Sequence, residues 1–255
     1  CTTCHNLDTP VIGTDGQLTD LIFPEQAVYT EWEYSDFNNS NVNTAQSCQE
    51  CHMPQAEGSV VISTMGNVGP REPFHQHKFL GANTYMLEIL KNNRVKLGAV
   101  ADETRFNVSI TDTREFLKAA ADVNITDISF ENGTLDFSVL VSNHSGHKFP
   151  TSLPSRRAWL HVKVTKTSDH TIVFESGAWD SSTNRIIGVD DNTDGYEPHY
   201  TDINDSLQVQ VYEPIMADTD GNQTYTFMNA ASYIKDNRIL PLGYKANTPT
   251  SAQPY

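Results

Sequence analysis

Two copies of one five-residue pattern lie within the first 51 positions of the chain. Residues 1–5 read Cys-Thr-Thr-Cys-His, and residues 48–52 read Cys-Gln-Glu-Cys-His. Together they contain all four cysteines of the 255 residues, and a histidine directly follows each pair. With 9 histidines in 255 residues, chance would place one after both pairs about once in a thousand sequences. The repeated pattern is therefore the feature that most restricts what this chain can form.

The C-x-x-C-H spacing is the attachment pattern of c-type haem. Two intervening residues separate the thiols so that they can add across the two vinyl groups of one porphyrin. The imidazole of the next residue then meets the iron from the same face. The sequence predicts two haem c groups, with thioether bonds from Cys1, Cys4, Cys48 and Cys51 and proximal ligands His5 and His52.

Two other uses of paired cysteines remain open at this stage. The pairs could build a Cys₄ zinc site, although 42 residues separate His5 from Cys48, against about 15–20 in a zinc ribbon. Each pair could instead be a redox dithiol or a local disulfide. Neither alternative requires a histidine after both pairs.

Covalent haem attachment takes place outside the cytoplasm, so we expect an exported bacterial protein, periplasmic or extracellular. Because the sequence opens on an attachment cysteine, we expect a mature, truncated or partial form of a longer chain. The 32 acidic and 17 basic residues give a net charge of −15, spread evenly along the chain. This balance argues against nucleic acid or an anionic membrane as a partner. No apolar run approaches the ~18–20 residues of a membrane-spanning helix.

Each iron also needs a second axial ligand or an open face. His75 and His77 lie in a loop before a helical pattern, and in an extended stretch they would face the same side. His147 follows Gly146, which permits close approach of the backbone to a large flat group. The remaining candidates are His144 and His199. From the local sequence patterns we interpret His161 as a strand-surface residue and His170 as a turn residue.

Two further sets of side chains are candidates for binding. Arg156 and Arg157 precede a strand pattern, where a guanidinium could pair with a haem propionate. Residues 190–195 begin like a calcium-binding loop, but position twelve is Thr201 rather than glutamate. A second acidic turn spans residues 218–222. The sequence thus allows Ca²⁺ without requiring it, since acidic turns containing glycine are common.

The hydrophobic periodicity changes near residue 122. Before that point, residues 6–47 are polar and irregular with an aromatic cluster, and helices are predicted at 84–98 and 112–121, the second capped by Asp112. After it, alternating patterns predict strands at 123–130, 134–142, 157–167, 171–176, 207–213 and 223–230. Asn132-Gly133 is a tight-turn sequence. We therefore predict an α+β protein: an irregular, helical dihaem region at 1–122 and an antiparallel β-sandwich at 123–255.

Several segments resemble the C-terminal part of multihaem c-type cytochromes, in which a β-rich domain follows a haem-bearing region. They are CQECHMP (48–54), HKFLGAN (77–83), SGHKFPTSLPSRRAWLHVKV (145–164), EPHY (197–200), VQVYEPIM (209–216) and IKDNRILPLGY (234–244). The resemblance implies electron transfer outside the cytoplasm with His–His ligation, and it points to His77 and His147 as distal ligands. Many members carry further C-x-x-C-H motifs upstream, which leaves the haem count of the complete protein open.

These patterns favour an electron carrier over a catalyst. Two imidazoles on each iron would give low-spin, low-potential haems that exchange single electrons. The expected partners are other redox proteins or further haem domains. Two alternatives remain: an oxidoreductase with one open haem that reduces a small substrate, and a subunit of an extracellular haem wire or filament.

Overall fold

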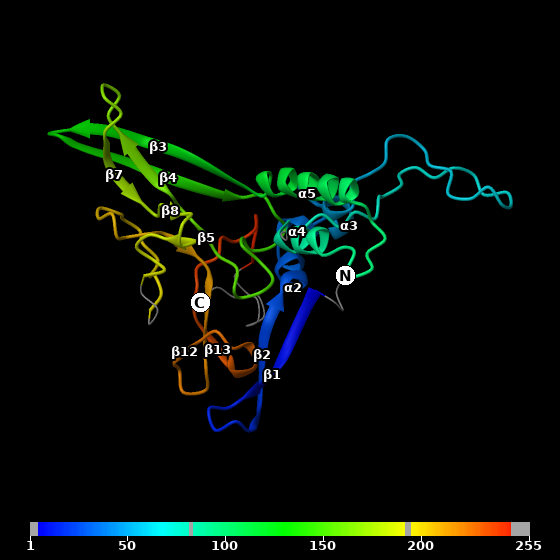
Figure 1. Ribbon diagram of the computed structural model, residues 1–255, viewed down its shortest axis with the longest axis horizontal. Helices are drawn as coiled ribbons and strands as arrows, with labels where there is room; N and C mark the ends of the chain where they lie inside the picture. The colour runs from blue at the N-terminus through cyan, green and yellow to red at the C-terminus, as the bar shows by residue number, and fades with distance from the viewer. Residues whose placement is uncertain (1–4, 82–83, 192–194, 246–255) are drawn as a thin grey trace. The chain divides into compact units, whose positions relative to one another are not determined.

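The computed structural model describes residues 5–81, 84–191 and 195–245 (Figure 1). The chain divides into two compact units. Unit 1 combines Cys1–Ser35 with His147–Tyr255, and unit 2 is Asp36–Gly146. The domain boundary predicted near residue 122 stays a prediction.

Unit 1 opens with a hairpin that the sequence analysis missed. β1 (Asn6–Ile12) pairs antiparallel with β2 (Leu18–Ala27), and the pairing contains two irregularities. A turn joins the strands, in which the Gly13 amide donates to the Gln17 carbonyl and the Gly16 amide to the Gly13 carbonyl. A proline inside each strand conceals the strand pattern, because proline cannot donate to a sheet. The short helix α2 (Val28–Glu33) follows directly.

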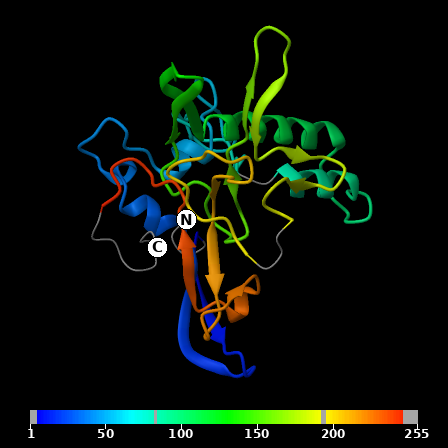
Figure 2. The same cartoon turned by 90° about the vertical axis from the view of Figure 1, so that its left-hand side faces the viewer.

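A three-stranded sheet packs against this hairpin. β11 (Pro214–Ala217) lies between β12 (Gln223–Thr224) and β13 (Ser232–Asp236), and the short helix η2 is Phe227–Asn229. The Phe23 and Tyr233 rings lie 4.8 Å apart at the centre of the contact. Figure 2 shows the hairpin beside β11 and β13. The buried core of this region comprises Val11, Phe23, Met216, Ala230 and Tyr233.

The remaining strands of unit 1 form short pairs around a second, smaller apolar cluster of Ile186, Val209 and Val211. Gly177 lies beside this cluster with φ +72°, a conformation that favours glycine. The pairs are β5 (Ala158–Trp159) with β10 (Val211–Tyr212), β6 (Val162–Thr165) with β7 (Ile172–Ser176), and β8 (Trp179–Asp180) with β9 (Arg185–Ile186).

Four buried charges link distant segments of unit 1. Lys148 Nζ lies 2.7 Å from Asp236, and Arg238 contacts the same carboxylate at 2.7 Å. Arg238 also pairs with Glu31 at 3.3 Å. We call these four side chains the ionic cluster; each is at most 7% exposed. Burial opposes ionisation of Asp236, but hydrogen bonds and charge from Arg238 and Lys148 outweigh it and lower the pKa of this carboxyl.

Unit 2 contains the helices η1 (Asp36–Asn38), α3 (Cys48–His52), α4 (Thr84–Asn92) and α5 (Glu103–Lys118). The helix expected at 84–98 is confirmed but ends at Asn92. Its neighbour begins nine residues before the predicted start at Asp112. Asp102 caps it by accepting a hydrogen bond from the Arg105 amide, whereas Asp112 lies within the helix and pairs with Lys78 at 2.8 Å.

The last element of unit 2 along the chain is the hairpin of β3 (Ala121–Glu131) and β4 (Thr134–Asn143). Both strands and their turn are confirmed: Asn132 and Gly133 each have positive φ, as a two-residue hairpin turn requires. The register places apolar side chains of the two strands on one face. This face consists of Val123, Ile125, Phe130, Leu135, Phe137, Val139 and Val141.

The predicted antiparallel β-sandwich is wrong. Among the described residues, the strands form six small separate sheets, five of two strands and one of three. Alternating hydrophobicity identifies strands but does not choose their partners, and most strands pair only with their neighbour along the chain. The predicted strand at 157–167 is divided at Leu160, and that at 207–213 is reduced to β10.

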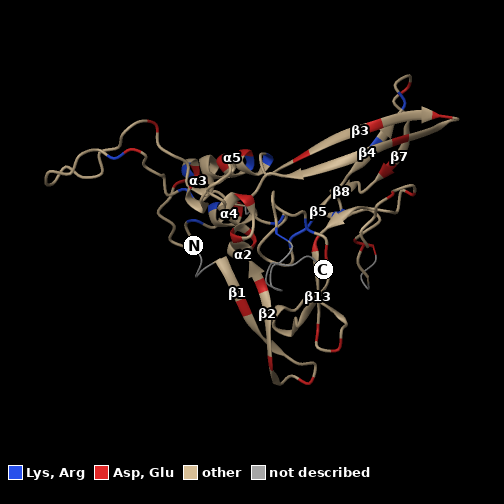
Figure 3. Cartoon of the chain, turned by 180° about the vertical axis from the view of Figure 1, so that it is seen from behind, with Lys and Arg blue, Asp and Glu red and all other residues tan. Residues whose placement is uncertain are grey.

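Acidic and basic side chains are scattered over both units (Figure 3). No helix in the described part of the chain combines the length and apolar character needed to cross a bilayer.

We predict that Gly177→Ala destabilises unit 1 more than Gly188→Ala. Both glycines have positive φ, so each substitution carries about 1–2 kcal/mol of backbone strain. A Cβ at position 177 would also overlap the Leu160 carbonyl oxygen, whereas the nearest atom to a Cβ at position 188 lies at an ordinary contact distance of 3.5 Å. Thermal unfolding followed by circular dichroism measures the difference, and equal midpoints for the two variants would contradict the prediction.

Candidate haem-binding site

The second five-residue motif forms its own short helix. Ser47 caps α3: its side chain accepts a hydrogen bond from the Glu50 amide, while the Glu50 carboxylate accepts one from the Ser47 amide at 2.6 Å. This reciprocal capping box explains why so short a segment is helical. The spacing Ser-x-x-Glu at 47–50 is visible in the sequence, although the sequence analysis did not use it. The helix fixes Cys48, Cys51 and His52 in order along one turn.

The imidazole of His52 is oriented by a segment 28 residues further along the chain. Its Nδ1 lies 2.5 Å from the Leu80 carbonyl oxygen, and the Leu80 amide donates to the His52 carbonyl at 3.0 Å. A carbonyl only accepts, so Nδ1 carries the proton and the lone pair of the neutral ring lies on Nε2. The ring also packs against Phe116 of α5, with centroids 5.3 Å apart.

The two thiols of the motif lie in a half-buried environment. Cys48 and Cys51 are free and half-buried, and the Cys51 thiol contacts Gln46 Oε1 at 3.2 Å. Burial, followed by the nearby Glu50 charge, raises the pKa of the Cys51 thiol. Reactive C-x-x-C motifs instead lower the pKa of their thiol.

The structure places His75 near the motif helix. His75 Nδ1 lies 2.7 Å from the carbonyl oxygen of Met53, the residue that follows His52, and the ring is half-buried. His77 is exposed and stacks edge-on against Phe79, with centroids 4.0 Å apart. The hydrogen bond from His75 to the Met53 carbonyl fixes the tautomer of His75, with the proton on Nδ1 and the lone pair on Nε2.

His147 lies at the start of the second segment of unit 1. Its Nδ1 lies 3.1 Å from the carbonyl oxygen of Lys148, a member of the ionic cluster. His144 differs, because its Nε2 pairs with Asp122 at 2.8 Å. His161 pairs with Glu175 in the same way, at 2.9 Å. His199 Nδ1 faces the side-chain amide of Gln210 at 2.8 Å.

The two arginines predicted to meet a propionate have protein partners. Arg157 forms an ion pair with Asp190 at 2.7 Å. Arg156 is half-buried and donates to the Thr151 carbonyl at 3.1 Å, and burial lowers the pKa of its guanidinium. The structure does not test a propionate contact at either residue.

Cys1 and Cys4 of the first motif lie outside the described residues, and His5 is exposed. The described residues contain no cluster of three or more histidine, cysteine or acidic side chains suited to a metal ion. The first acidic loop lies partly outside the described ranges. In the second, the Asp218 side chain accepts from the amides of Asp220 and Asn222 and so stabilises the turn itself.

Unit 2 has very little apolar core. Of the buried apolar side chains in the described residues, Ile110 alone belongs to it. Large apolar side chains are instead exposed on α4, on the following turn and on the loop between α3 and α4. They include Met65, Val68, Phe79, Tyr85, Met86, Leu90, Val95 and Leu97.

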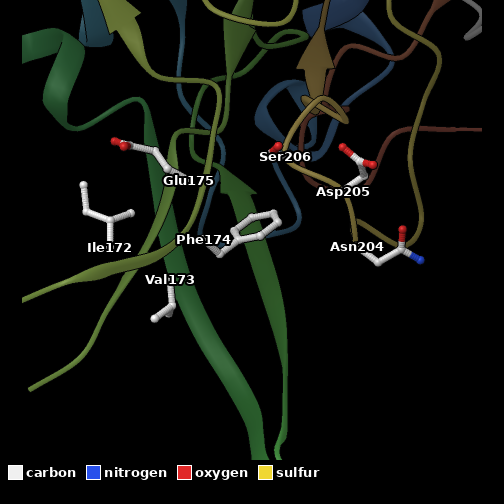
Figure 4. A pocket seen from close by; sticks show the side chains of 7 residues that line it. All are labelled: Ile172, Val173, Phe174, Glu175, Asn204, Asp205 and Ser206. Atoms are coloured by element: carbon white, nitrogen blue, oxygen red, sulfur yellow. The ribbon is translucent and has the colours of Figure 1, made fainter.

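Neither of two surface hollows in unit 1 contains a motif residue. The larger, about 410 Å³, lies between β7 and residues 204–206, and Figure 4 shows Phe174 and Glu175 among its lining side chains. The other, about 370 Å³, is bounded by Trp159, Trp179 and Arg157.

Comparison with known proteins gives one weak similarity. No family model matches the chain, and no curated protein matches it. A penta-haem cytochrome c552 from Thermochromatium tepidum aligns with 96% of this chain at 17% identity and a TM-score of 0.47. The chain spans 41% of that protein.

We predict that Ser47→Ala loosens α3. Loss of an N-cap costs about 1 kcal/mol, which corresponds to roughly fivefold faster exchange of the Glu50 amide. Hydrogen exchange with mass spectrometry measures this. Ser63→Ala is the control, because Ser63 caps a turn at Met65 in the same unit but no helix. Unchanged exchange at Glu50 would show that the capping box does not stabilise the motif helix.

Proposed function

We propose that this chain is an electron-transfer segment of an exported c-type cytochrome with two covalently attached haems. The observation that carries the proposal is the geometry of residues 48–52. Two thiols and an imidazole follow one another on a single capped helix, and the imidazole is held in the tautomer that a metal ligand needs. The first motif has the same residue types at the same spacing.

The residues around α3 fit a haem. Cys48 and Cys51 would form the thioethers and His52 would be the proximal ligand. The Leu80 carbonyl would keep Nδ1 of His52 protonated, increase the basicity of the ring and prevent its rotation. Phe116 supplies an aromatic wall beside the ring. When bound, a haem supplies a one-electron Fe(III)/Fe(II) couple.

The exposed apolar side chains of unit 2 also support the proposal. A unit of this length whose described residues include one buried apolar side chain gains little hydrophobic stabilisation from them. Burial of apolar surface is worth about 25 cal/mol per Å². A covalently held macrocycle would supply the missing apolar partner, and the surrounding chain would in turn exclude water from it.

For the distal ligands we propose His147 and one histidine of the pair His75 and His77. His75 and His147 each have Nδ1 at a backbone carbonyl, which leaves the lone pair on Nε2. The family resemblance favours His77 instead, so the pair has to be separated by mutation. Two imidazoles on each iron would keep both haems low-spin and at low potential, which suits electron exchange rather than catalysis.

Location and partners follow from this function. Covalent haem attachment implies export, so we propose a periplasmic or extracellular protein. Its partners would be redox proteins or further haem domains of a longer chain. The net charge of −15 favours partners with a basic docking surface.

We predict that the intact mass of the purified protein exceeds that of the polypeptide by two haems. In a Cys48→Ala/Cys51→Ala variant the excess falls to one haem, because one porphyrin loses both thioethers. Mass spectrometry and the pyridine haemochrome spectrum check both values. A colourless protein with the bare polypeptide mass would rule out the proposed function.

We predict that His147→Ala converts one haem from low spin to high spin. The spin states of the His75→Ala and His77→Ala variants identify the other distal ligand, since only the variant that lacks the ligand becomes high-spin. His161→Ala is the control, because its ring pairs with Glu175 and it is not a proposed ligand. Absorption and electron paramagnetic resonance spectra report the spin state. A high-spin signal already present in the unmutated protein would indicate an open haem and favour the oxidoreductase alternative.

A further inference from the structure

The segment that carries His147 is held by hydrogen bonds or ion pairs at Lys148, Phe149 and Thr151. The Lys148 amide donates to Glu31 Oε2 at 3.1 Å, and the Lys148 ammonium pairs with Asp236 at 2.7 Å. Phe149 exchanges two backbone hydrogen bonds with Ile239, both of 2.9 Å. Thr151 Oγ1 donates to the same Glu31 oxygen at 2.7 Å.

The His147 ring contacts this arrangement at the backbone of Lys148. Its Nδ1 lies 3.1 Å from the carbonyl oxygen of Lys148, so the residue that orients the imidazole is the one whose amide and ammonium are both fixed by the ionic cluster. Movement of the Lys148 backbone would move the acceptor of the His147 ring.

The charges of the ionic cluster balance. Glu31 and Asp236 supply two carboxylates, and Lys148 and Arg238 supply two cations, all within unit 1 and at most 7% exposed. Arg238 bridges the carboxylates, with Nε 2.8 Å and Nη2 2.7 Å from Asp236 and Nη1 3.3 Å from Glu31. Removal of one partner would leave an uncompensated buried charge, which is strongly unfavourable. The cluster therefore holds its four residues in fixed positions, unlike an ion pair on the surface.

We propose that Lys148, with Glu31, Asp236 and Arg238, is a positioning residue for the distal haem ligand His147. This inference rests on the proposed function. Lys148 does not touch the iron or the porphyrin in this scheme. It fixes the carbonyl that sets the tautomer and direction of the His147 ring, so that Nε2 is presented to an iron without the cost of ordering the segment on ligation.

The test compares Lys148→Met with Lys235→Met in the haem-loaded protein. Lys235 is a matched control: it is 7% exposed in the same unit, and its ammonium pairs with Glu213 at 3.0 Å and the Val211 carbonyl at 3.1 Å, outside the ionic cluster. Both variants lose a buried lysine. Spectra are recorded at a temperature where circular dichroism shows each variant folded.

We expect Lys148→Met to lose low-spin signal from the same haem that His147→Ala affects, and added imidazole to restore it. Amide exchange in residues 147–151 should also rise by about tenfold or more. Lys235→Met should leave the spectrum unchanged. A folded Lys148→Met with the parent spectrum, or equal spectral change in both lysine variants, overturns the inference.

A milder variant covers the case in which Lys148→Met does not fold. Thr151→Val removes one hydrogen bond to Glu31 and keeps the three ion pairs of the cluster. We expect a smaller change in the same direction, and an unchanged spectrum overturns the inference. The failure modes are distinct. Absence of haem refutes the proposed function, and a low-spin His147→Ala variant refutes the ligand and with it the inference. A shifted His147→Ala beside an unaffected Lys148→Met refutes the inference alone.

Discussion

Unit 1 depends on the four buried charges that join its two chain segments. Glu31 lies 117 residues from Lys148, and Lys148 lies 88 residues from Asp236, so the ionic cluster closes long loops of the chain. Without it, only the two small apolar clusters would hold these loops together. Breaking such a pair costs about 3–5 kcal/mol, against a total stability of about 5–15 kcal/mol for an ordinary domain. The hydrogen bonds that Glu31 accepts from Lys148 and Thr151 extend this constraint to the backbone beside His147.

Unit 2 is organised in the opposite way. Polar contacts join its helices α4 and α5, such as Lys91 to Asn107 at 3.2 Å and Arg114 to Glu88 at 3.4 Å, and Ile110 of α5 is its one buried apolar side chain among the described residues. Polar surface contacts contribute little stability. Under the proposed function, a macrocycle bound at the motif helix would be both the redox centre and the apolar partner of these side chains.

The sequence predicted what depends on near neighbours. The β3–β4 hairpin follows from alternation and from Asn132-Gly133. Prediction from the sequence failed where the interacting residues are far apart in the chain, and where a residue that disfavours strands lies within one. Pro10 and Pro24 concealed β1 and β2, and the sandwich required strand pairings that alternation does not specify. No local pattern distinguishes buried Lys148 from exposed Lys163, because the carboxylate that buries Lys148 lies at position 236.

Hydrogen bonding divides the described histidines into groups that the sequence alone does not separate. His52, His75 and His147 each place Nδ1 at a backbone carbonyl, which accepts only and therefore directs the lone pair to Nε2. His144 and His161 instead place Nε2 at a carboxylate, which favours a proton on the nitrogen that a distal ligand would use. His144 and His147 are three residues apart in one turn, yet only His147 has the tautomer of a ligand. The backbone carbonyls of Leu80, Met53 and Lys148 are thus as important to the proposed chemistry as the imidazoles they orient.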